Sequence, residues 1–233
     1  DSDGAPTKPA IGFAKGCGVS VEDLAQTETD KGLRLVFRRV EEGLATKALL
    51  PDIVSKALKD LPIARRMRWG ASRIEFVRPV HWIVMLFGKN VVPGSIMGLE
   101  SGRTTRGHRF HSNTEINIAT PTDYANTLRK AFVIADFVER RSLIEDGVNE
   151  LAQGAKGNAV IDVDLLDEVT ALNEWPVPLM GRFDEHFLEV PAEALVSSMK
   201  EHQKYFHVVD GADQLLPLFI TVANIDSRDA TKV

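Results

Sequence analysis

The sequence has a single cysteine, Cys17, among 233 residues, and it has no apolar run close to the roughly 20 residues that a membrane-spanning helix needs. One thiol excludes a disulfide within the chain and fits a reducing cytoplasm. The apolar run from Ile83 to Phe87 has the length of a strand, not of a membrane span. We therefore expect a cytoplasmic protein that does not cross a membrane.

The short motifs of several enzyme classes are also missing. The sequence contains no G-x-x-x-x-G-K-[ST], no G-x-S-x-G and no G-x-G-x-x-G. "KGCG" is too short and isolated to be a phosphate loop, and no His or Asn near Cys17 suggests an activated thiol, so we expect a partly buried thiol there. We expect no catalytic residue and no cofactor site in this chain.

Two other groups of possible metal or acid–base residues have simpler explanations. His108 and His111 stand three apart, but the surrounding arginines would repel a divalent cation, and no matching Cys or His pair occurs elsewhere. We therefore expect no metal site. Among the acidic residues after residue 161, Asp164 is predicted to cap a helix, and the others to lie on a solvated face.

The charge is strongly uneven, although the net charge is only −5. Between Leu61 and Asn113 nine Lys/Arg face two acids, a net of +7, so the remaining residues carry −12. Eight of the nine are arginine, which favours planar, bidentate contacts with phosphate or carboxylate. One interpretation is a local site for an anion, and the other is a set of internal ion pairs with the acidic remainder.

The densest part of this basic region is "SGRTTRGHRF", residues 101–110, which we expect to be a loop. Arg103, Arg106 and Arg109 stand three apart, with His108 among them. A second cluster, "MKEHQKYF", places Lys200 and Lys204 before two aromatic residues. Basic groups beside aromatic rings suit single-stranded nucleic acid, through phosphate pairing and base stacking. The alternative for the second cluster is compensation of a helix dipole by lysine, with the aromatics in the core, which we favour for Phe206.

A third stretch, "MRWGASRIEFVRPVHW", carries two tryptophans and three arginines. Trp69 and Trp82 are expected to be mostly buried and structural. Arg68, Arg73 and Arg78 could line one border of a basic groove.

Helical and strand patterns alternate irregularly along the chain, which favours an α+β fold over a doubly wound sheet. The apolar spacing predicts helices near residues 9–16, 50–61, 121–132, 136–154, 164–175 and 191–202. Strands are predicted near 32–40, 83–87, 91–99, 159–163, 176–183, 204–210 and 215–225, with 32–40 half-buried and 83–87 buried on both faces. Residues 1–29 are interpreted as a connector with short helices, and 30–233 as one α+β module. The absence of an initiator Met and the end soon after a strand suggest a piece of a longer protein.

Several long stretches, in this order, resemble one known family: "LPIARRMRWGASRIEFVRPVHWIVMLFG", "SGRTTRGHRF", "IADFVERR", "EVTALNEWPVPLMGRFDEHFLEVPAEALVSSMKEHQKYF" and "LPLFITVANIDSRD". They are similar to the beta subunit of bacterial heterotetrameric glycyl-tRNA synthetase. The resemblance extends from about Pro9 to Asp229. It implies that the chain is an amino-proximal fragment of that subunit.

The resemblance implies an α2β2 ligase that joins glycine to its tRNA using ATP. In that family the alpha subunit handles ATP and glycine, and the beta subunit contributes tRNA recognition and holds the assembly together. The region also resembles the B3/B4-type module of the phenylalanyl-tRNA synthetase beta subunit, where a related module edits misacylated tRNA. An editing deacylase and a purely structural link are thus alternatives to tRNA binding, although a synthetase for the smallest amino acid can exclude larger ones by pocket size.

These considerations give one hypothesis for the site. We expect the RNA-binding residues to be those of the two basic clusters: Arg103, Arg106, His108, Arg109, Lys200 and Lys204. The expected partners are the alpha subunit, a second beta subunit and tRNA(Gly).

Overall fold

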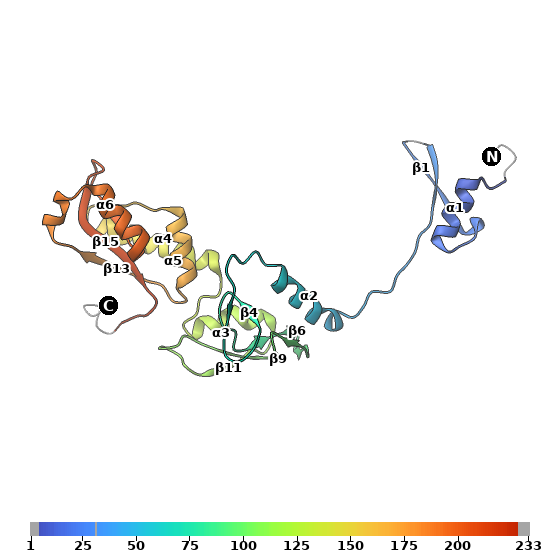
Figure 1. Ribbon diagram of the computed structural model, residues 1–233, viewed down its shortest axis with the longest axis horizontal. Helices are drawn as coiled ribbons and strands as arrows, with labels where there is room; N and C mark the ends of the chain where they lie inside the picture. The colour runs from blue at the N-terminus through green and yellow to red at the C-terminus, as the bar shows by residue number, and fades with distance from the viewer. Residues whose placement is uncertain (1–4, 31, 228–233) are drawn as a thin grey trace. The chain divides into compact units, whose positions relative to one another are not determined.

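The computed structural model describes residues 5–30 and 32–227 (Figure 1). The contacts of the chain divide it into a first compact unit that ends at Thr46 and a second that begins at Lys47. The first four residues of the predicted connector and the last six of the predicted module lie outside the described residues. Within these residues the chain has six α-helices and several small sheets, so the predicted α+β class is confirmed.

The first unit is a helix followed by a hairpin. Helix α1 (Lys8–Cys17) ends where Gly18 takes a left-handed φ of 72°, and the turn η1 (Val21–Asp23) follows its cap, Ser20. Strands β1 (Ala25–Thr29) and β2 (Gly32–Val36) form an antiparallel pair, and the predicted division after residue 29 falls between them. Strand β2 corresponds to the strand that was predicted at 32–40 to be half-buried. That prediction is wrong for the first three residues of β2, which are exposed because no layer of this unit covers them.

The second unit begins at the second residue of α2 (Thr46–Asp60), whose Leu50, Val54 and Leu58 pack on a small core of Met85, Val92 and Ile96. Short strands surround that core: β3 (Met67–Arg68), β4 (Glu75–Phe76), β5 (Ile83–Val84), β6 (Leu86–Phe87), β7 (Asn90–Val91), β8 (Ser95–Ile96), β9 (Leu99–Gly102), β10 (Thr104–Arg106) and β11 (Glu115–Asn117).

The prediction of one strand at 83–87, buried on both faces, is wrong. Strand β5 pairs in parallel with β9, whereas β6 turns at Gly88 and pairs antiparallel with β7. Of residues 83–87 only Met85 is buried, while Ile83 packs against the core partly buried and Phe87 is 48% exposed. The predicted return strand at 91–99 is likewise divided into short pieces. A continuous apolar run gives no period, so it does not reveal that its residues bend toward different partners.

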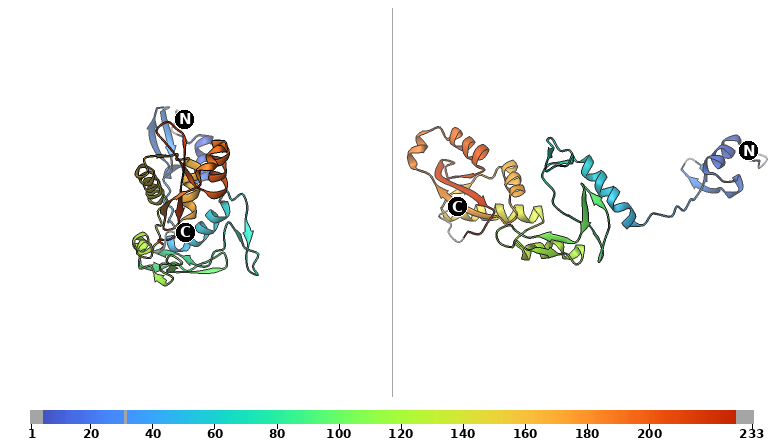
Figure 2. Two further views of the ribbon diagram at one scale, coloured as in Figure 1. Left: turned by 90° about the vertical axis from the view of Figure 1, so that its left-hand side faces the viewer. Right: turned by 60° about the horizontal axis from the view of Figure 1, so that its bottom comes forward.

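The larger core lies around a four-stranded antiparallel sheet in the order β12-β14-β15-β13. Its strands are β12 (Asn158–Ala159), β13 (Val177–Arg182), β14 (Phe206–Val209) and β15 (Leu215–Ala223). Helix α4 (Phe137–Gly154) packs against β13, β15 and α5 (Val163–Leu172), as Figures 1 and 2 show. Ile144, Val148, Leu166, Phe206 and Ile220 are fully buried at this contact.

The remaining helical segments are α3 (Tyr124–Lys130), α6 (Ala192–Ser197), the 3-10 turns η2 (Pro121–Asp123) and η3 (Glu185–Glu189), and the π-helix η4 (Ser198–Gln203). Asp162, not the predicted Asp164, caps α5, because its side chain accepts a hydrogen bond from the N–H of Leu165. None of the helices in the described residues is long and apolar enough to cross a membrane. The likeness to the B3/B4-type module stays a prediction.

Candidate nucleic-acid interface

The arginine-rich segment is partly a strand, not the loop that we expected. Residues Thr104–Arg106 form β10, which pairs with β11 so that Arg106 lies opposite Glu115. Thr105 is buried, whereas Arg106 is exposed, because successive side chains of a strand point to opposite faces. The pairing therefore fixes the direction in which Arg106 leaves the backbone.

The three arginines of this segment have different partners. Arg103 Nη2 donates to the carbonyl oxygen of Lys89 at 2.8 Å. Arg106 Nη2 lies 3.6 Å from Glu115 Oε1, and both side chains are more than half exposed. Arg109 has no carboxylate within salt-bridge distance among residues 5–30 and 32–227, and its guanidinium carbon lies 5.9 Å from the centre of the Phe110 ring. Carboxylates of the described chain therefore neutralise this arginine set only weakly.

Other arginines of the basic region do form internal contacts. Arg68 Nε lies 2.6 Å from Glu75 Oε1, across the β3–β4 pair. Arg66 donates to the carbonyl oxygen of Lys59 at 2.9 Å. Arg73 and Arg78 are exposed. The internal contacts of the second interpretation are thus present in part of the basic region, and the anion site of the first stays a prediction for its exposed arginines.

His108 does not lie on the surface. Its side chain is 1% exposed, and its Nε2 lies 2.6 Å from the carbonyl oxygen of Asn224. Its Nδ1 accepts hydrogen bonds from the N–H groups of Phe110 and His111, both at 3.3 Å. Because Nδ1 accepts, the neutral ring carries its proton on Nε2, which donates to Asn224. This burial separates His108 from the exposed arginines on either side.

His108 belongs to a packed junction of aromatic rings. The ring centres of His108 and His111 are 4.8 Å apart, those of His111 and Phe132 5.0 Å, and those of Phe132 and Trp175 5.2 Å. The side chain of Asn224 accepts hydrogen bonds from the N–H groups of Glu174 and Trp175. We call these rings and Asn224 the His108 junction. It connects the arginine-rich segment to the end of β15, and no local signal in the sequence indicates it.

The two lysines of the second cluster are paired within the chain. Lys200 Nζ lies 2.6 Å from Asp162 Oδ2, and Lys204 Nζ lies 2.9 Å from Glu168 Oε2. The hydrogen bond between Lys200 and Asp162 raises the pKa of the lysine and lowers the pKa of the carboxyl group. Both contacts hold the π-helix η4 against α5. Neither lysine therefore presents an unpaired charge, in contrast to Arg109.

The aromatic residues of that cluster also face the protein. Phe206 is fully buried, as predicted, and Tyr205 stacks on Phe219 with ring centres 4.4 Å apart. The second cluster thus forms part of the fold around the four-stranded sheet.

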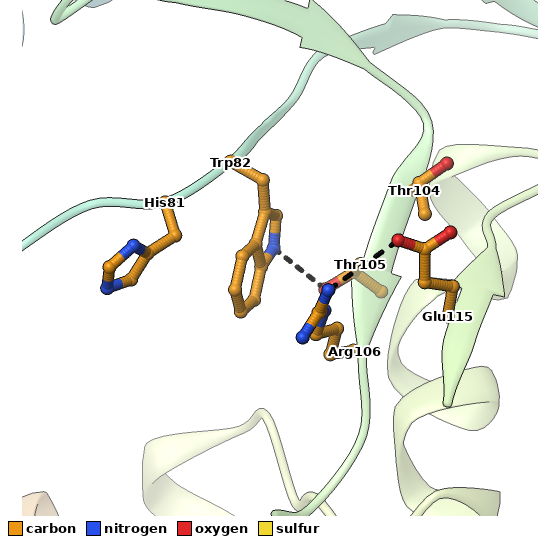
Figure 3. Close-up of a pocket in the computed structure, with 6 residues that line it drawn as sticks. All are labelled: His81, Trp82, Thr104, Thr105, Arg106 and Glu115. Atoms are coloured by element: carbon orange, nitrogen blue, oxygen red, sulfur yellow. Dashed lines mark hydrogen bonds and ion pairs between the residues drawn. The ribbon is translucent and has the colours of Figure 1, made fainter. Parts of the chain in front are cut away.

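A cavity of about 460 Å³ lies beside Arg106 (Figure 3). It is lined by His81, Trp82, Thr104, Thr105, Arg106 and Glu115. The prediction that Trp82 is mostly buried is wrong, because the residue is 44% exposed. Its Nε1 donates to Thr105 Oγ1 at 3.1 Å, so the polar end of the indole is bonded while part of the ring faces the cavity.

The described residues contain no group of three or more His, Cys, Asp or Glu side chains that could hold a metal ion. Cys17 is partly buried, as predicted. The exposed arginines around β10 and the cavity next to them are therefore the candidate site.

The whole chain, residues 1–233, matches the model of the family described as "Glycyl-tRNA synthetase beta subunit". It is 58% identical over 235 residues to the "Glycine--tRNA ligase beta subunit" of Marinobacter nauticus and 56% identical over 234 residues to that of Hahella chejuensis. Both alignments cover 100% of this chain and 34% of the relative. The chain thus spans about a third of the length of these relatives. It belongs to the glycyl-tRNA synthetase beta subunit family.

Proposed function

We propose that this chain contributes tRNA binding and subunit architecture to a cytoplasmic glycine–tRNA ligase, which joins glycine to tRNA(Gly) with the energy of ATP. Membership of the beta subunit family supports this role. In the proposed assembly, two alpha subunits bind ATP and glycine, and two beta subunits hold the tRNA. This division of labour agrees with the absence from the sequence of the common nucleotide-binding motifs.

The observation that carries the proposal is the exposure of Arg106 and Arg109 without a close carboxylate. Arg106 has only a long, solvent-exposed contact to Glu115, and Arg109 has no carboxylate partner in the described part of the chain. Exposed pairs of this kind contribute about 0–1 kcal/mol, so the contact can open for RNA at small cost. Arginines so placed give RNA affinity and register without base specificity.

The test uses the complete ligase, with the full-length beta subunit and its alpha partner. We expect replacement of Arg103, Arg106 and Arg109 by alanine to weaken tRNA(Gly) binding and to reduce its salt dependence. Removing one phosphate contact lowers the slope of log K against log [salt] by about 0.7 to 0.9. The matched control is Arg68→Ala, which removes an arginine that is paired with Glu75 and should leave the slope unchanged.

Two outcomes would contradict the proposal. If the triple variant keeps the salt slope of tRNA binding but has lower thermal stability, the arginines stabilise the fold and do not contact RNA. Failure to assemble with the alpha subunit, with normal tRNA affinity per assembled ligase, would make the segment a structural link between subunits.

A further inference from the structure

The cavity beside Arg106 combines an aromatic surface with one charged group of each sign. Trp82 and His81 line one side of it, and Arg106 and Glu115 extend from the β10–β11 pair on the other (Figure 3). Its volume, about 460 Å³, is in the range of small-ligand sites. Phosphate binding alone requires no aromatic ring, so the indole points to a flat ligand.

The indole of Trp82 is held in place by its own hydrogen bond. Its Nε1 donates at 3.1 Å to the hydroxyl of Thr105, which is 6% exposed in β10. With the N–H already bonded, the exposed part of Trp82 offers a π-face, which favours stacking over polar recognition. A ring fixed in this way loses little conformational freedom when a ligand stacks on it.

The neighbouring imidazole leaves room for such a ligand. The ring centres of His81 and Trp82 are 6.4 Å apart, with 31° between their planes, so the two rings do not stack on each other. The imidazole therefore does not close off the indole by stacking on it.

Arg106 and Glu115 can read the edge of a stacked ring. Their contact is long, 3.6 Å, and their side chains are 54% and 69% exposed, so it is easily opened by a competing partner. Guanidinium donates to a carbonyl oxygen, and carboxylate accepts from N–H groups. Guanine presents O6 beside N1–H and N2–H2 on one edge, and thus matches both groups at once. Adenine, cytosine and uracil each lack part of this pattern.

We propose that the cavity binds an unpaired guanine of RNA, stacked on Trp82, with Arg106 donating to its O6 and Glu115 accepting from its N1–H and N2–H2. This site deepens the proposed function and rests on it, since the RNA must reach the arginine-rich segment. It assigns Arg106 to a base and leaves the phosphate contacts of the segment to Arg103 and Arg109.

The first test measures tRNA(Gly) binding by the complete ligase with Trp82→Ala and Trp82→Phe. Loss of stacking on the alanine variant should weaken binding about 5- to 150-fold. The slope against salt should not change, because stacking releases no counterions. Phenylalanine keeps an aromatic face but loses the bond to Thr105, so it should retain binding to within about 5-fold. Equal weakening by both variants would make Trp82 a structural residue and overturn the proposal.

The second test identifies the base. Single-stranded pentamers UUGUU, UUAUU, UUCUU and UUUUU compete with tRNA(Gly) for the ligase. UUGUU should compete best, and Glu115→Gln should abolish its advantage, because the amide replaces one acceptor by a donor. Equal competition by all four pentamers would overturn the assignment to guanine.

The third test asks what covers the cavity. With p-benzoylphenylalanine in place of Trp82, irradiation of the ligase–tRNA complex should crosslink to an unpaired nucleotide of the tRNA. Crosslinking only to protein would mean that another part of the ligase fills the cavity, which would overturn the guanine site. The salt slope of the arginine triple variant tests the proposed function separately, so a failure of that function is distinguishable from a failure of the guanine site.

Discussion

His108 Nε2 lies 2.6 Å from the carbonyl oxygen of Asn224, a residue 116 positions further along the chain. The bond joins the segment just after β10 to the end of β15. Next to it, His111 Nε2 accepts from the N–H of Asp226 at 3.0 Å. Two histidines from the most basic stretch of the sequence thus anchor that stretch to the sheet, while Arg106 and Arg109 remain exposed.

This relationship predicts a large effect of His108→Ala on stability. The substitution removes a buried hydrogen bond to Asn224 and the acceptor for the N–H groups of Phe110 and His111. Leaving buried polar groups unpaired costs about 1–3 kcal/mol, so the free energy of unfolding should fall by about that amount. Urea denaturation followed by circular dichroism measures it. Arg109→Ala, next to it in sequence but exposed, should change the value by less than about 0.5 kcal/mol; equal effects would contradict the burial of His108.

Two glycines of α4 give a matched pair of substitutions. A Cβ on Gly147 would lie 2.7 Å from Cγ of Pro178 in β13, whereas a Cβ on Gly154 meets nothing within 4 Å. Gly147→Ala should therefore lower the free energy of unfolding by about 1–3 kcal/mol through overpacking, despite the better helix propensity of alanine. Gly154→Ala should raise it by up to about 1 kcal/mol. Thermal unfolding of both variants measures these changes in stability. If both substitutions stabilise the protein, α4 is not closely packed against β13 at Gly147.

Asp162 combines a helix cap with an ion pair, and two substitutions separate these roles. Asparagine can still cap α5 but cannot pair with Lys200, whereas alanine does neither. The ion pair lowers the pKa of Asp162, so its stabilising contribution is present above the unfolded pKa of about 3.9 and is lost as the pH falls through the folded value. The difference in the free energy of unfolding between wild type and Asp162→Asn should thus shrink below about pH 4.

The cap itself depends less on charge. Asp162→Ala should be less stable than Asp162→Asn by about 0.5–2 kcal/mol, and this difference should persist at acid pH. Urea titrations of the three proteins between pH 7 and pH 3 give both quantities. A gap between wild type and Asp162→Asn that stays constant with pH would exclude the ion pair.

His207 of β14 predicts a second pH dependence, in a different window. Burial lowers its pKa, because desolvation disfavours the imidazolium. The unfolded chain then binds a proton more readily than the folded one, so stability declines as the pH falls below the unfolded value of about 6.5. In His207→Gln the urea midpoint should vary less between pH 7 and pH 5 than it does in wild type. An unchanged pH profile would mean that His207 is solvated.

The parts of the fold that follow from local pattern were predictable. The period of 136–154 predicts α4 because Ile144 and Val148 recur on one face, and Asp136 caps the helix. The apolar character of 215–225 predicts β15, which lies inside the four-stranded sheet. The prediction of one strand at 83–87 was wrong because an apolar run predicts burial but not where the backbone bends.

The candidate site was only partly predictable, since charge patterns do not reveal partners. Lys200 and Arg106 look equally available in the sequence. Their environments differ because α5 brings Asp162 to within 2.6 Å of Lys200, whereas β11 places Glu115 3.6 Å from Arg106. Trp82 was expected in the core because most tryptophans are largely buried, and its place beside a cavity depends on the β10–β11 pair.

The sequence by itself determined the family, the α+β class and the concentration of arginine between residues 61 and 113, because these depend on residue order and local periodicity. Only the tertiary structure decided which basic side chains face solvent. That choice depends on carboxylates, carbonyl groups and rings brought close from distant positions, as Asn224 is brought to His108. Long-range contacts of this kind leave no mark in the local pattern, so the exposed Arg106 and the buried His108, two residues apart, could not be told apart beforehand.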